Sequence, residues 1–362
     1  MKILVIHATA GAGHRKAAEA VHHGFVTKTS HPTTIIDALD YTSPFYKKAY
    51  SQTYTFLISY LPWVWGAIFE LIDQPALVPI VRWIRRCQNA LVGRKLCQYL
   101  IHEQFDCIVS THFFPNEVVS ALKKEKKISS KLISVVTDFD VHTIWLGSGV
   151  DYYAVACEWT KEKIKTFGIS DEKIFVSGIP THETFQEFYQ KEIIRQKLGL
   201  VEDAFTVLVA TGSFGIGPIE QIVDSFKDVQ ILVLCGHNQS LYERLKRKES
   251  RLIHVYPLVR NMHEMMSASD VMVTKPGGLS IAEALVKGLP LIFFNAIPGQ
   301  ETNNVKVLSH HGVGLMPKSV EHIVQAIQSL RDSSEHFDTA VQKIKTLARP
   351  DAVETILKLA II

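Results

Sequence analysis

The sequence predicts an α/β protein made of two Rossmann-like domains, each a parallel sheet with helices on its faces. Three observations lead to this fold class. The chain has 362 residues, which is more than a single domain usually holds. Hydrophobic residues make up 47% and charged residues 21%, enough apolar material for two cores. Both halves repeat one order, a short β-branched apolar run, a glycine-containing turn and a helical pattern, which is typical of parallel sheets.

The strand-like runs divide into two series. In the first half we expect strands at 2–7, 33–36, 106–110, 132–137, 152–156 and 174–177, with a turn at 8–13 and a helix at 14–25. The second half starts a new series, with strands at 205–210, 230–235, 252–256, 271–274 and 291–294 and a helix at 279–287. A join near the break at Ile179-Pro180 predicts domains at 1–180 and 181–340, followed by a C-terminal helical segment at 341–362 that could pack back on the first domain.

Bulk composition excludes several classes of protein. The net charge of +3 is too small to indicate nucleic acid, and we expect no nucleic-acid partner. The five cysteines have no C-x-x-C spacing, so we expect buried thiols in a reducing compartment rather than a zinc or redox site. The apolar run at the N-terminus is too short for a signal peptide, which favours a cytoplasmic protein.

In open parallel sheets, ligands bind beyond the carboxyl ends of the strands. The first such turn contains Gly11, Gly13 and His14, where the backbone can approach a ligand closely and a histidine can serve as a general base. A dinucleotide fingerprint would need a third glycine at position 16, where Lys16 stands. Asp37 lies where a ribose-binding acid would, so a nicotinamide enzyme stays among the alternatives.

The stretch after the strand at 132–137 contains Asp138, Asp140 and His142. A D-x-D pattern can bind a divalent metal, but the second half offers another way to hold a diphosphate, and we expect no metal here. Asp138 and His142 are candidates for the acceptor side of the cleft, and either could equally be a structural turn residue.

The glycine-rich turns of the second half favour an anionic ligand. Gly212 and Ser213 follow the strand at 205–210, and their amides could cradle phosphate. The strongest motif is 274–280, in which Gly277, Gly278, Leu279 and Ser280 open a helix whose free N–H groups attract a diphosphate. Glu283 lies one turn further on the same face, where a carboxylate could bind both hydroxyls of a ribose.

The motif 298–301 follows the strand at 291–294. Gln300 and Glu301 offer several acceptors and one amide donor on a short loop, which suits the hydroxyls of a hexose. A solvated loop is the alternative reading of this motif.

Together these motifs resemble one family, the processive diacylglycerol glucosyltransferases and the related monogalactosyldiacylglycerol synthases, whose wider kin include the N-acetylglucosaminyltransferase of lipid II synthesis. The resemblance covers most of the chain and rests on the stretches GHR at 13–15, VTDF at 136–139, IW at 144–145, DYYAV at 151–155, GIP at 178–180, TKPGGLS at 274–280 and PGQE at 298–301. The first glycine turn departs from the family, because many relatives have a longer glycine run there.

The resemblance implies the GT-B fold, an α-linked UDP-hexose donor and inverting transfer to a lipid, most simply diacylglycerol. At matching positions, Glu283 would bind the ribose, and Gln300 with Glu301 the sugar. Gly277 and Gly278 would hold the diphosphate, and the backbone around Tyr256 and Leu258 would meet the uracil. His14 would be the base, with Asp138 beside it in the catalytic site and with Gly13 and His142 on the acceptor side. No cofactor or obligatory metal is expected.

The segment 41–100 suggests how the protein reaches a lipid. It is rich in aromatic residues, and residues 74–102 contain no acidic side chain. Aromatic rings favour the headgroup level of a bilayer, and basic clusters are attracted to anionic lipids. We expect a peripheral attachment to the inner face of the cell membrane through Trp63, Trp65, Trp83, Arg82, Arg85 and Arg86. An ordinary packed helical pair is the alternative. The nearly uncharged stretch 54–72 has almost the length of a membrane span, but Pro62 and Gly66 interrupt it, so we expect a buried or interfacial segment.

Four other functions share parts of this pattern. A sugar-nucleotide epimerase has the same fold and donor site but no acceptor. A transferase that moves N-acetylglucosamine from its UDP derivative to a polyprenyl-linked lipid differs only in substrates. A nicotinamide dehydrogenase needs an intact first glycine turn, and a silent binding protein would keep the UDP site without turnover. The aromatic and basic segment favours a lipid-modifying transferase over the epimerase, the dehydrogenase and the silent binder.

Overall fold

The computed structural model describes residues 1–9, 11–74, 76–212, 215, 217–226 and 228–362, without the side chain of residue 51. By its internal contacts the chain forms two compact units. Unit 1 comprises Met1–His182, Ile297–Asn303 and Arg349–Ile362, and unit 2 comprises Glu183–Ala296 and Asn304–Ala348. The sequence analysis placed 297–303 inside the domain at 181–340, whereas its contacts group it with unit 1.

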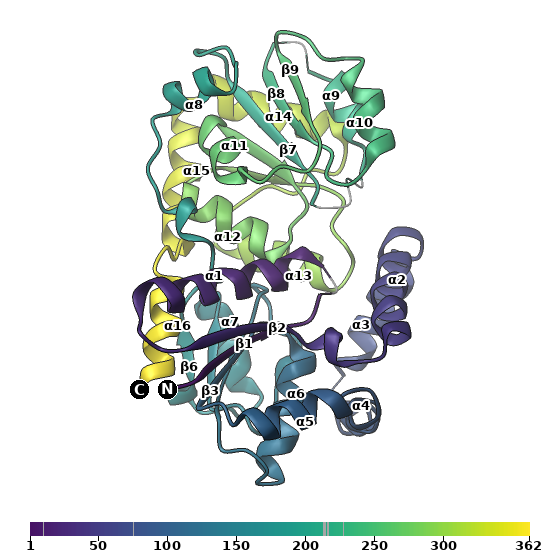
Figure 1. Ribbon diagram of the computed structural model, residues 1–362. Helices are drawn as coiled ribbons and strands as arrows, with labels where there is room; N and C mark the ends of the chain where they lie inside the picture. Colours follow the sequence, from purple (N-terminus) through teal and green to yellow (C-terminus); the bar gives the residue numbers. More distant parts are fainter. Residues whose placement is uncertain (10, 75, 213–214, 216, 227) are drawn as a thin grey trace. The chain divides into compact units, whose positions relative to one another are not determined.

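Unit 1 contains a sheet of six parallel strands in the order β2-β1-β3-β4-β5-β6 (Figure 1). The strands are β1 Ile3–His7, β2 Thr33–Asp37, β3 Cys107–Ser110, β4 Lys131–Val135, β5 Tyr152–Val155 and β6 Ile174–Val176. Each predicted strand of the first half is present, with ends that differ by at most two residues. The prediction succeeds because β-branched apolar runs bounded by turn residues are the strongest local signal for buried parallel strands.

Alternation along the strands divides the core of unit 1 between two faces. Ile3 and Val5 of β1 pack with α1 (Ala12–Lys28) and α16 (Ala352–Ile361). Leu4 and Ile6 face the other way, onto α5 (Arg94–Glu103), α6 (Phe113–Lys124) and α7 (Glu158–Thr166). The short 3₁₀ helices of this unit are η1 Ala38–Tyr41, η2 Thr143–Trp145 and η3 Asp171–Lys173.

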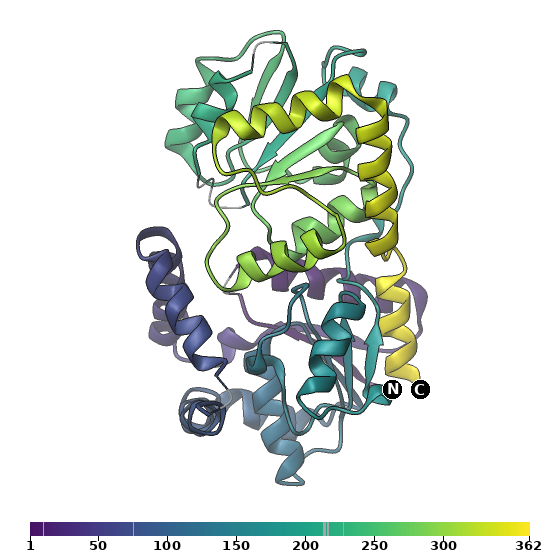
Figure 2. The same cartoon turned by 180° about the vertical axis from the view of Figure 1, so that it is seen from behind.

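Unit 2 contains a five-stranded parallel sheet in the order β11-β10-β7-β8-β9. The strands are β7 Thr206–Ala210, β8 Gln230–Leu234, β9 Ile253–Tyr256, β10 Val271–Thr274 and β11 Leu291–Phe293. One face is covered by α9 (Ile219–Asp224), α10 (Gln239–Lys246) and α14 (Val320–Asp332), and α14 lies across the sheet in Figure 2. Helix α11 (Met262–Ala268) also packs on β7, and it contacts α12 (Gly278–Lys287). The remaining helices are η4 Glu183–Phe185, α8 Lys191–Lys197, α13 Gln300–His310 and α15 Ser334–Leu347.

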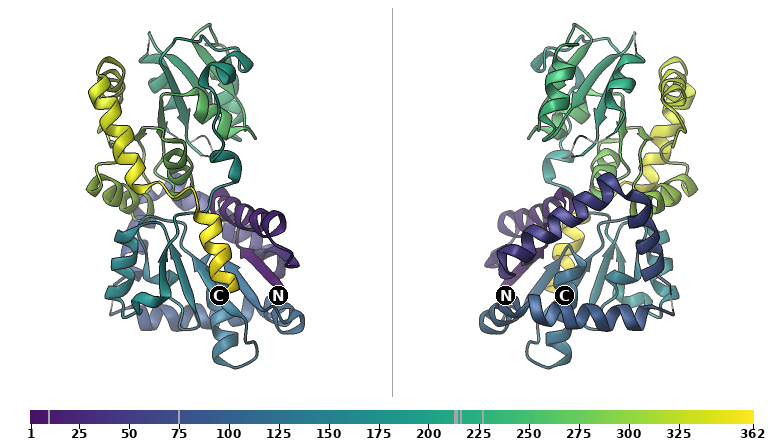
Figure 3. Two further views of the ribbon diagram at one scale, coloured as in Figure 1. Left: turned by 90° about the vertical axis from the view of Figure 1, so that its left-hand side faces the viewer. Right: turned by 90° about the vertical axis from the view of Figure 1, so that its right-hand side faces the viewer.

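Three helices between β2 and β3 gather on one side of unit 1 (Figure 3). They are α2 (Pro44–Tyr60), α3 (Pro62–Ile72) and α4 (Val78–Val92). The stretch 54–72 is therefore not one helix. Proline disfavours helical geometry in the residue before it, and Leu61 has φ −133° and ψ 50°, so the chain breaks there. Within the described residues no single helix is long and apolar enough to cross a membrane, and α2 and α3, which reach the required length only together, are bent by 113°.

Candidate functional site

The carboxyl ends of β1, β3 and β4 meet at one edge of the unit 1 sheet, and the predicted acceptor-side residues follow these strands. Helix α1 begins at Ala12, two residues earlier than predicted, so Gly13 and His14 belong to its first turn. Its N-cap, Gly11, makes no side-chain hydrogen bond, and a Cβ placed there would meet nothing within 4 Å. The start of α1 therefore presents backbone rather than side chains.

His14 is held by the end of β3. Its Nδ1 lies 2.8 Å from the carbonyl oxygen of Thr111 and 2.9 Å from the hydroxyl of Thr137. A carbonyl can only accept, so Nδ1 carries the proton and Nε2 keeps its lone pair. The Thr111 hydroxyl in turn donates to the His14 carbonyl at 2.8 Å. One residue thus ties down both the ring and the backbone of His14.

The surroundings of His14 keep it neutral. Burial lowers its pKa to about 4, and the bond to the Thr111 carbonyl opposes this only partly. The ring of His112 packs edge-on at 4.6 Å between centroids, and Trp145 lies at 6.0 Å. A neutral imidazole with the proton on Nδ1 can accept a proton at Nε2, and a pKa of about 4 makes it a weaker base than a histidine whose pKa matches neutral pH.

Asp37, the candidate ribose acid of a nicotinamide enzyme, has a local role. It accepts from the amides of Leu39 at 3.0 Å and Thr9 at 3.3 Å, and so caps η1. Its other oxygen, Oδ2, lies 3.5 Å from Lys47 Nζ, so the carboxylate is engaged by the residues around it.

Asp138 and Gln300 are 162 residues apart in sequence and form one contact in unit 1. The Gln300 amide nitrogen donates to both oxygens of the Asp138 carboxylate, at 2.9 and 3.0 Å, and Asp138 is only 6% exposed. Glu301 folds back so that its Oε2 accepts from the amide of Ile297 at 2.8 Å. The amide of Gly299 donates to Thr302 Oγ1 at 3.0 Å. The loop that bears the predicted sugar-binding residues is thus closed on itself and anchored to Asp138.

His142 and Asp140 are both engaged by the scaffold. His142 Nδ1 accepts from the amide of Ile144 at 3.0 Å, and Nε2 donates to the carbonyl of Phe69 at 2.9 Å. Both ring nitrogens are used, so His142 cannot serve as a base in this arrangement. Asp140 forms an ion pair with Lys163 at 2.7 Å. The D-x-D motif therefore does not present two carboxylates to one ligand, and the described residues contain no group of three or more metal-ligating side chains.

The donor motif of unit 2 begins where β10 ends. Helix α12 starts at Gly278 with Gly277 as its N-cap, which makes no side-chain hydrogen bond and has φ −74°. A Cβ on Gly277 would meet nothing within 4 Å, so the space over the first turn is open. Asn304 Nδ2 donates to the Pro276 carbonyl at 3.1 Å and fixes the approach to the helix. The first N–H groups of a helix have no partner within the helix, and an N-terminus without a side-chain cap suits a diphosphate.

Several other predicted donor residues belong to unit 2, whereas Gln300 and Glu301 belong to unit 1. Leu279, Ser280 and Glu283 are half-buried on α12. Gly212 follows β7 with φ +75° and open space around it. Ser213 lies outside the described residues. Tyr256 ends β9 and its carbonyl accepts from the Cys235 amide at 2.9 Å, while Leu258 is exposed.

The predicted membrane residues do not share one environment. Trp63 and Trp83 are 70% and 66% exposed, and Arg82 and Arg86 are exposed as well. Trp65 is half-buried and packs edge-on against Tyr54 at 5.3 Å.

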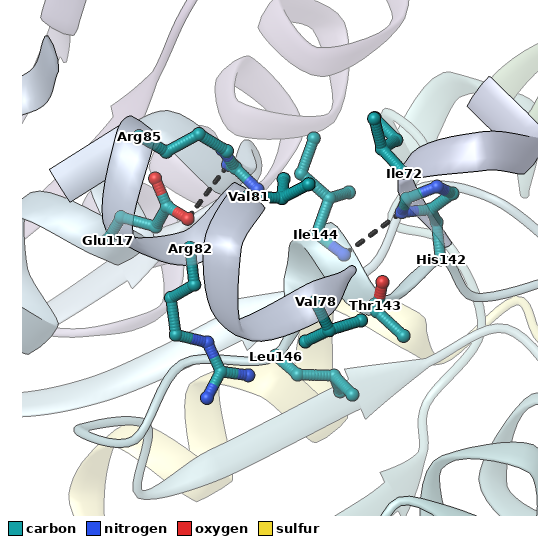
Figure 4. Close-up of a pocket in the computed structure, with 10 residues that line it drawn as sticks. All are labelled: Ile72, Val78, Val81, Arg82, Arg85, Glu117, His142, Thr143, Ile144 and Leu146. Atoms are coloured by element: carbon teal, nitrogen blue, oxygen red, sulfur yellow. Dashed lines mark hydrogen bonds and ion pairs between the residues drawn. The ribbon is translucent and has the colours of Figure 1, made fainter. Parts of the chain in front are cut away.

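Arg85 is turned inward and forms an ion pair with Glu117 at 3.0 Å. Figure 4 shows the pocket where this happens, with Arg85 beside Glu117 and the guanidinium of Arg82 directed away from it. The sequence analysis predicted membrane contact for Arg85, whereas its ion pair with Glu117 gives it a structural role.

Sequence reasoning missed three residues of the site. Thr111 orients His14, and Thr137 makes the second contact with its Nδ1. Tyr54 lies near the loop that bears Gln300 and Glu301, because burial and then the charges of Glu301 and Asp138 raise the pKa of Tyr54. Thr111 and Thr137 could have been found, because each stands just beyond the carboxyl end of a strand. Nothing in the local pattern around Tyr54 marks it.

Comparisons with known proteins bear on both halves of the chain. The family described as "Monogalactosyldiacylglycerol (MGDG) synthase" matches residues 14–181, and "Glycosyltransferase family 28 C-terminal domain" matches residues 206–356. A curated relative from Bacillus cereus (strain B4264), named processive diacylglycerol beta-glucosyltransferase, is 28% identical over 97% of this chain and 90% of its own length.

Solved structures agree on the fold. MurG of Acinetobacter baumannii aligns with a TM-score of 0.59 at 14% identity, covering 99% of each chain. Anabaena HepE in complex with UDP-glucose aligns at 0.59 and 15% identity, covering 100% of this chain and 98% of that one. These findings confirm the resemblance that the motifs predict: the chain is a glycosyltransferase of the GT-B fold, similar to the diacylglycerol glucosyltransferases and monogalactosyldiacylglycerol synthases.

Proposed function

We propose that the protein transfers a hexose, most simply glucose, from a UDP-sugar to the free hydroxyl of diacylglycerol with inversion at the anomeric carbon. The observation that carries the proposal is His14, a neutral histidine whose proton is fixed on Nδ1 by the Thr111 carbonyl. The acceptor and the glucosyl group come from the name of the Bacillus cereus relative. A β-glucoside made from an α-linked donor requires inversion, which one base can achieve in a single displacement.

In this mechanism His14 Nε2 takes the proton of the acceptor hydroxyl as its oxygen attacks the anomeric carbon. The bond to the diphosphate breaks on the opposite face, and UDP leaves with the electron pair. A positioned base contributes about 10²–10⁴-fold to the rate. Negative charge develops on the leaving diphosphate, and the first turn of α12 has amides and a helix dipole suited to it.

Sugar specificity falls to the loop 297–301, which we call the sugar reader. The amide nitrogen of Gln300 donates to the buried Asp138 carboxylate. This hydrogen bond, rather than solvent, fixes the direction of the Gln300 carbonyl oxygen. The Asp138 carboxylate is thereby a positioning group for the sugar reader as well as a neighbour of Thr137, which contacts the base. This arrangement supplies charge stabilisation from protein groups, and we propose that no metal is needed.

We propose that the protein reaches the acceptor through a surface of its own that contacts the bilayer. We call it the membrane surface and define it as the exposed apolar side chains of α2, α3 and α4. It consists of Phe45, Phe56, Tyr60, Trp63, Ile68, Leu71, Ile80, Trp83, Ile84 and Leu91. Arg82 and Arg86 flank it on α4 and suit an anionic lipid surface. Attachment of this kind is peripheral, on the leaflet that faces the cytoplasm.

The test is incubation with a panel of labelled UDP-sugars and diacylglycerol in mixed micelles, followed by lipid extraction and NMR of the anomeric proton. Label in the organic phase with a β-linkage supports the proposal, and the most active donor identifies the sugar. A changed UDP-sugar without any lipid product would indicate an epimerase instead. Label incorporated only with a polyprenyl-linked acceptor would indicate the other lipid transferase.

A further inference from the structure

Helix α3 has two faces with different partners. Trp63, Ile68 and Leu71 are 70%, 42% and 56% exposed and belong to the membrane surface. Gly66 and Phe69, three residues apart, lie together on the opposite face, where they pack on the loop that carries Gln300 and Glu301. One short helix therefore touches both the proposed lipid side and the proposed sugar reader.

The contact between α3 and the loop places a glycine of each segment against a side chain of the other, Gly66 against Pro298 and Gly299 against Phe69. A Cβ placed on Gly66 would lie 2.5 Å from Pro298 Cβ and 3.4 Å from the Pro298 carbonyl carbon. A Cβ placed on Gly299 would lie 2.7 Å from Phe69 Cδ1. Gly299 also has φ +85°, which other residues rarely adopt. Two glycines, one on each side, thus allow an approach that any side chain would prevent.

Helix α3 also holds the segment that follows Asp138, the residue that binds Gln300. The Phe69 carbonyl accepts from His142, and the two rings lie 4.3 Å apart. Just beyond the helix, Asp73 Oδ1 accepts from the amide of Thr143 at 2.8 Å and from its hydroxyl at 2.7 Å. Residues 142 and 143 belong to the loop that begins at Asp138. A shift of α3 would therefore move both sides of that contact.

We propose that Gly66 and Phe69 are positioning residues that make binding of the donor sugar depend on the bilayer. A membrane that binds Trp63 and Leu71 holds α3 against Pro298 and Gly299, and so keeps Gln300 and Glu301 in position to bind the hexose. The inference rests on the proposed function, because it uses the loop as sugar reader and α3 as a lipid contact. Linkage makes the effect reciprocal, so the sugar must tighten membrane binding by the same factor.

The test compares UDP-glucose with UDP, which lacks the part that the loop would bind. Each is titrated into the full-length protein by calorimetry, with and without vesicles of phosphatidylcholine and phosphatidylglycerol that contain no diacylglycerol. The Kd of UDP-glucose should fall about fivefold or more on adding vesicles, at the lower end of typical coupling. The Kd of UDP should not change. Vesicle sedimentation should show the same factor when UDP-glucose is added.

Variants separate coupling from folding. Gly66→Ala should abolish the vesicle effect on UDP-glucose while leaving UDP affinity and vesicle binding intact. Alanine is a better helix former than glycine, so a weaker helix cannot cause that loss. Phe69→Leu, which removes the ring beside Gly299, should act in the same way and serves if Gly66→Ala does not fold. Ala67→Ser changes an exposed neighbour on the same helix and should behave like wild type.

Three results would overturn the coupling. They are equal UDP-glucose affinity with and without vesicles, an equal vesicle effect on UDP, or full coupling in both Gly66→Ala and Phe69→Leu. If UDP-glucose is transferred to diacylglycerol but vesicles do not alter its binding, the coupling fails and the proposed function stands. If neither UDP-glucose nor UDP binds, both fail.

Discussion

The pKa of His14 makes the pH dependence of catalysis the sharpest test of its role. Burial lowers this pKa to about 4, against an ordinary value of 6.5. A general base acts only when unprotonated, so the rate should follow the neutral fraction of the ring. Activity should therefore persist at pH values where an ordinary histidine would already be protonated.

The size of the effect follows from the two pKa values. At pH 5.5 a group with a pKa of about 4 is roughly 97% neutral, whereas a histidine at its ordinary pKa would be roughly 9% neutral. The ratio of kcat/KM at pH 5.5 to that at pH 7.5 should thus be close to 1 for His14. An unperturbed base would give a ratio of about 0.1.

The assay is transfer of labelled glucose to diacylglycerol in micelles of fixed composition and ionic strength, between pH 5 and 8. His14→Gln keeps an amide that can donate to the Thr111 carbonyl but has no base, and should lose about 10²–10⁴-fold in kcat. A midpoint near pH 6.5 in the wild type, or undiminished turnover of His14→Gln, would refute the reasoning.

Stability must be followed separately over the same range. The folded pKa of His14 lies below its unfolded value, so the unfolded chain takes up a proton first as the pH falls. The stability that His14 contributes is complete above about pH 6.5 and is lost progressively as the pH falls towards 4. Thermal unfolding at each pH distinguishes this loss from protonation of the base.

Three further predictions concern the donor loop, the diphosphate site and the membrane surface. Glu301→Ala should lower sugar transfer by about 10²-fold with unchanged UDP affinity by calorimetry, because it removes the carboxylate that we propose binds the sugar. Gly277→Ala should weaken UDP binding about tenfold without changing the melting temperature, since its Cβ meets only open space. Gly288→Ala, at φ +68° on the same helix, should instead cost about 1–2 kcal/mol of stability and leave UDP binding intact. Arg82→Ala should weaken flotation with anionic vesicles by about 1 kcal/mol, whereas Arg85→Ala should cost about 3 kcal/mol of unfolding free energy because it leaves the largely buried Glu117 carboxylate without its counter-charge, with only the Asn89 amide to donate to it. A melting temperature lowered by Gly277→Ala, or unchanged in Arg85→Ala, would contradict these assignments.

The strands and the donor helix could be predicted because their signals are local. The run from Val271 to Thr274, followed by two glycines and an apolar helical pattern, is a strand, a turn and a helix in any surroundings. Arg85 could also have been placed correctly. Val78, Val81, Arg85 and Val92 recur at helical spacing on the half-buried face of α4, and Arg82 and Arg86 lie outside it. The sequence analysis counted the basic residues of this segment and did not consider which face of the helix each one occupies.

The contact between Asp138 and Gln300 had no such signal. Each residue was predicted from its own motif, but 162 positions of chain separate them, and no local rule pairs two polar side chains at that distance. The inclusion of 297–303 in unit 1 has the same origin. It depends on Gly66 and Gly299 permitting a close backbone approach, and a glycine in a sequence shows only that such an approach is allowed.

The proposed base and the proposed sugar reader are linked by two consecutive residues just beyond β4. Thr137 contacts His14, and Asp138 holds Gln300. Because the two residues are consecutive, one short backbone segment can serve two sites that need not touch. Their relative geometry is then set by the backbone beyond β4, a strand buried on both faces, rather than by a flexible network of side chains. In the proposed mechanism this segment relates the position of the acceptor oxygen to that of the anomeric carbon, and α3 can adjust it through its contacts with His142 and with the loop at Pro298 and Gly299.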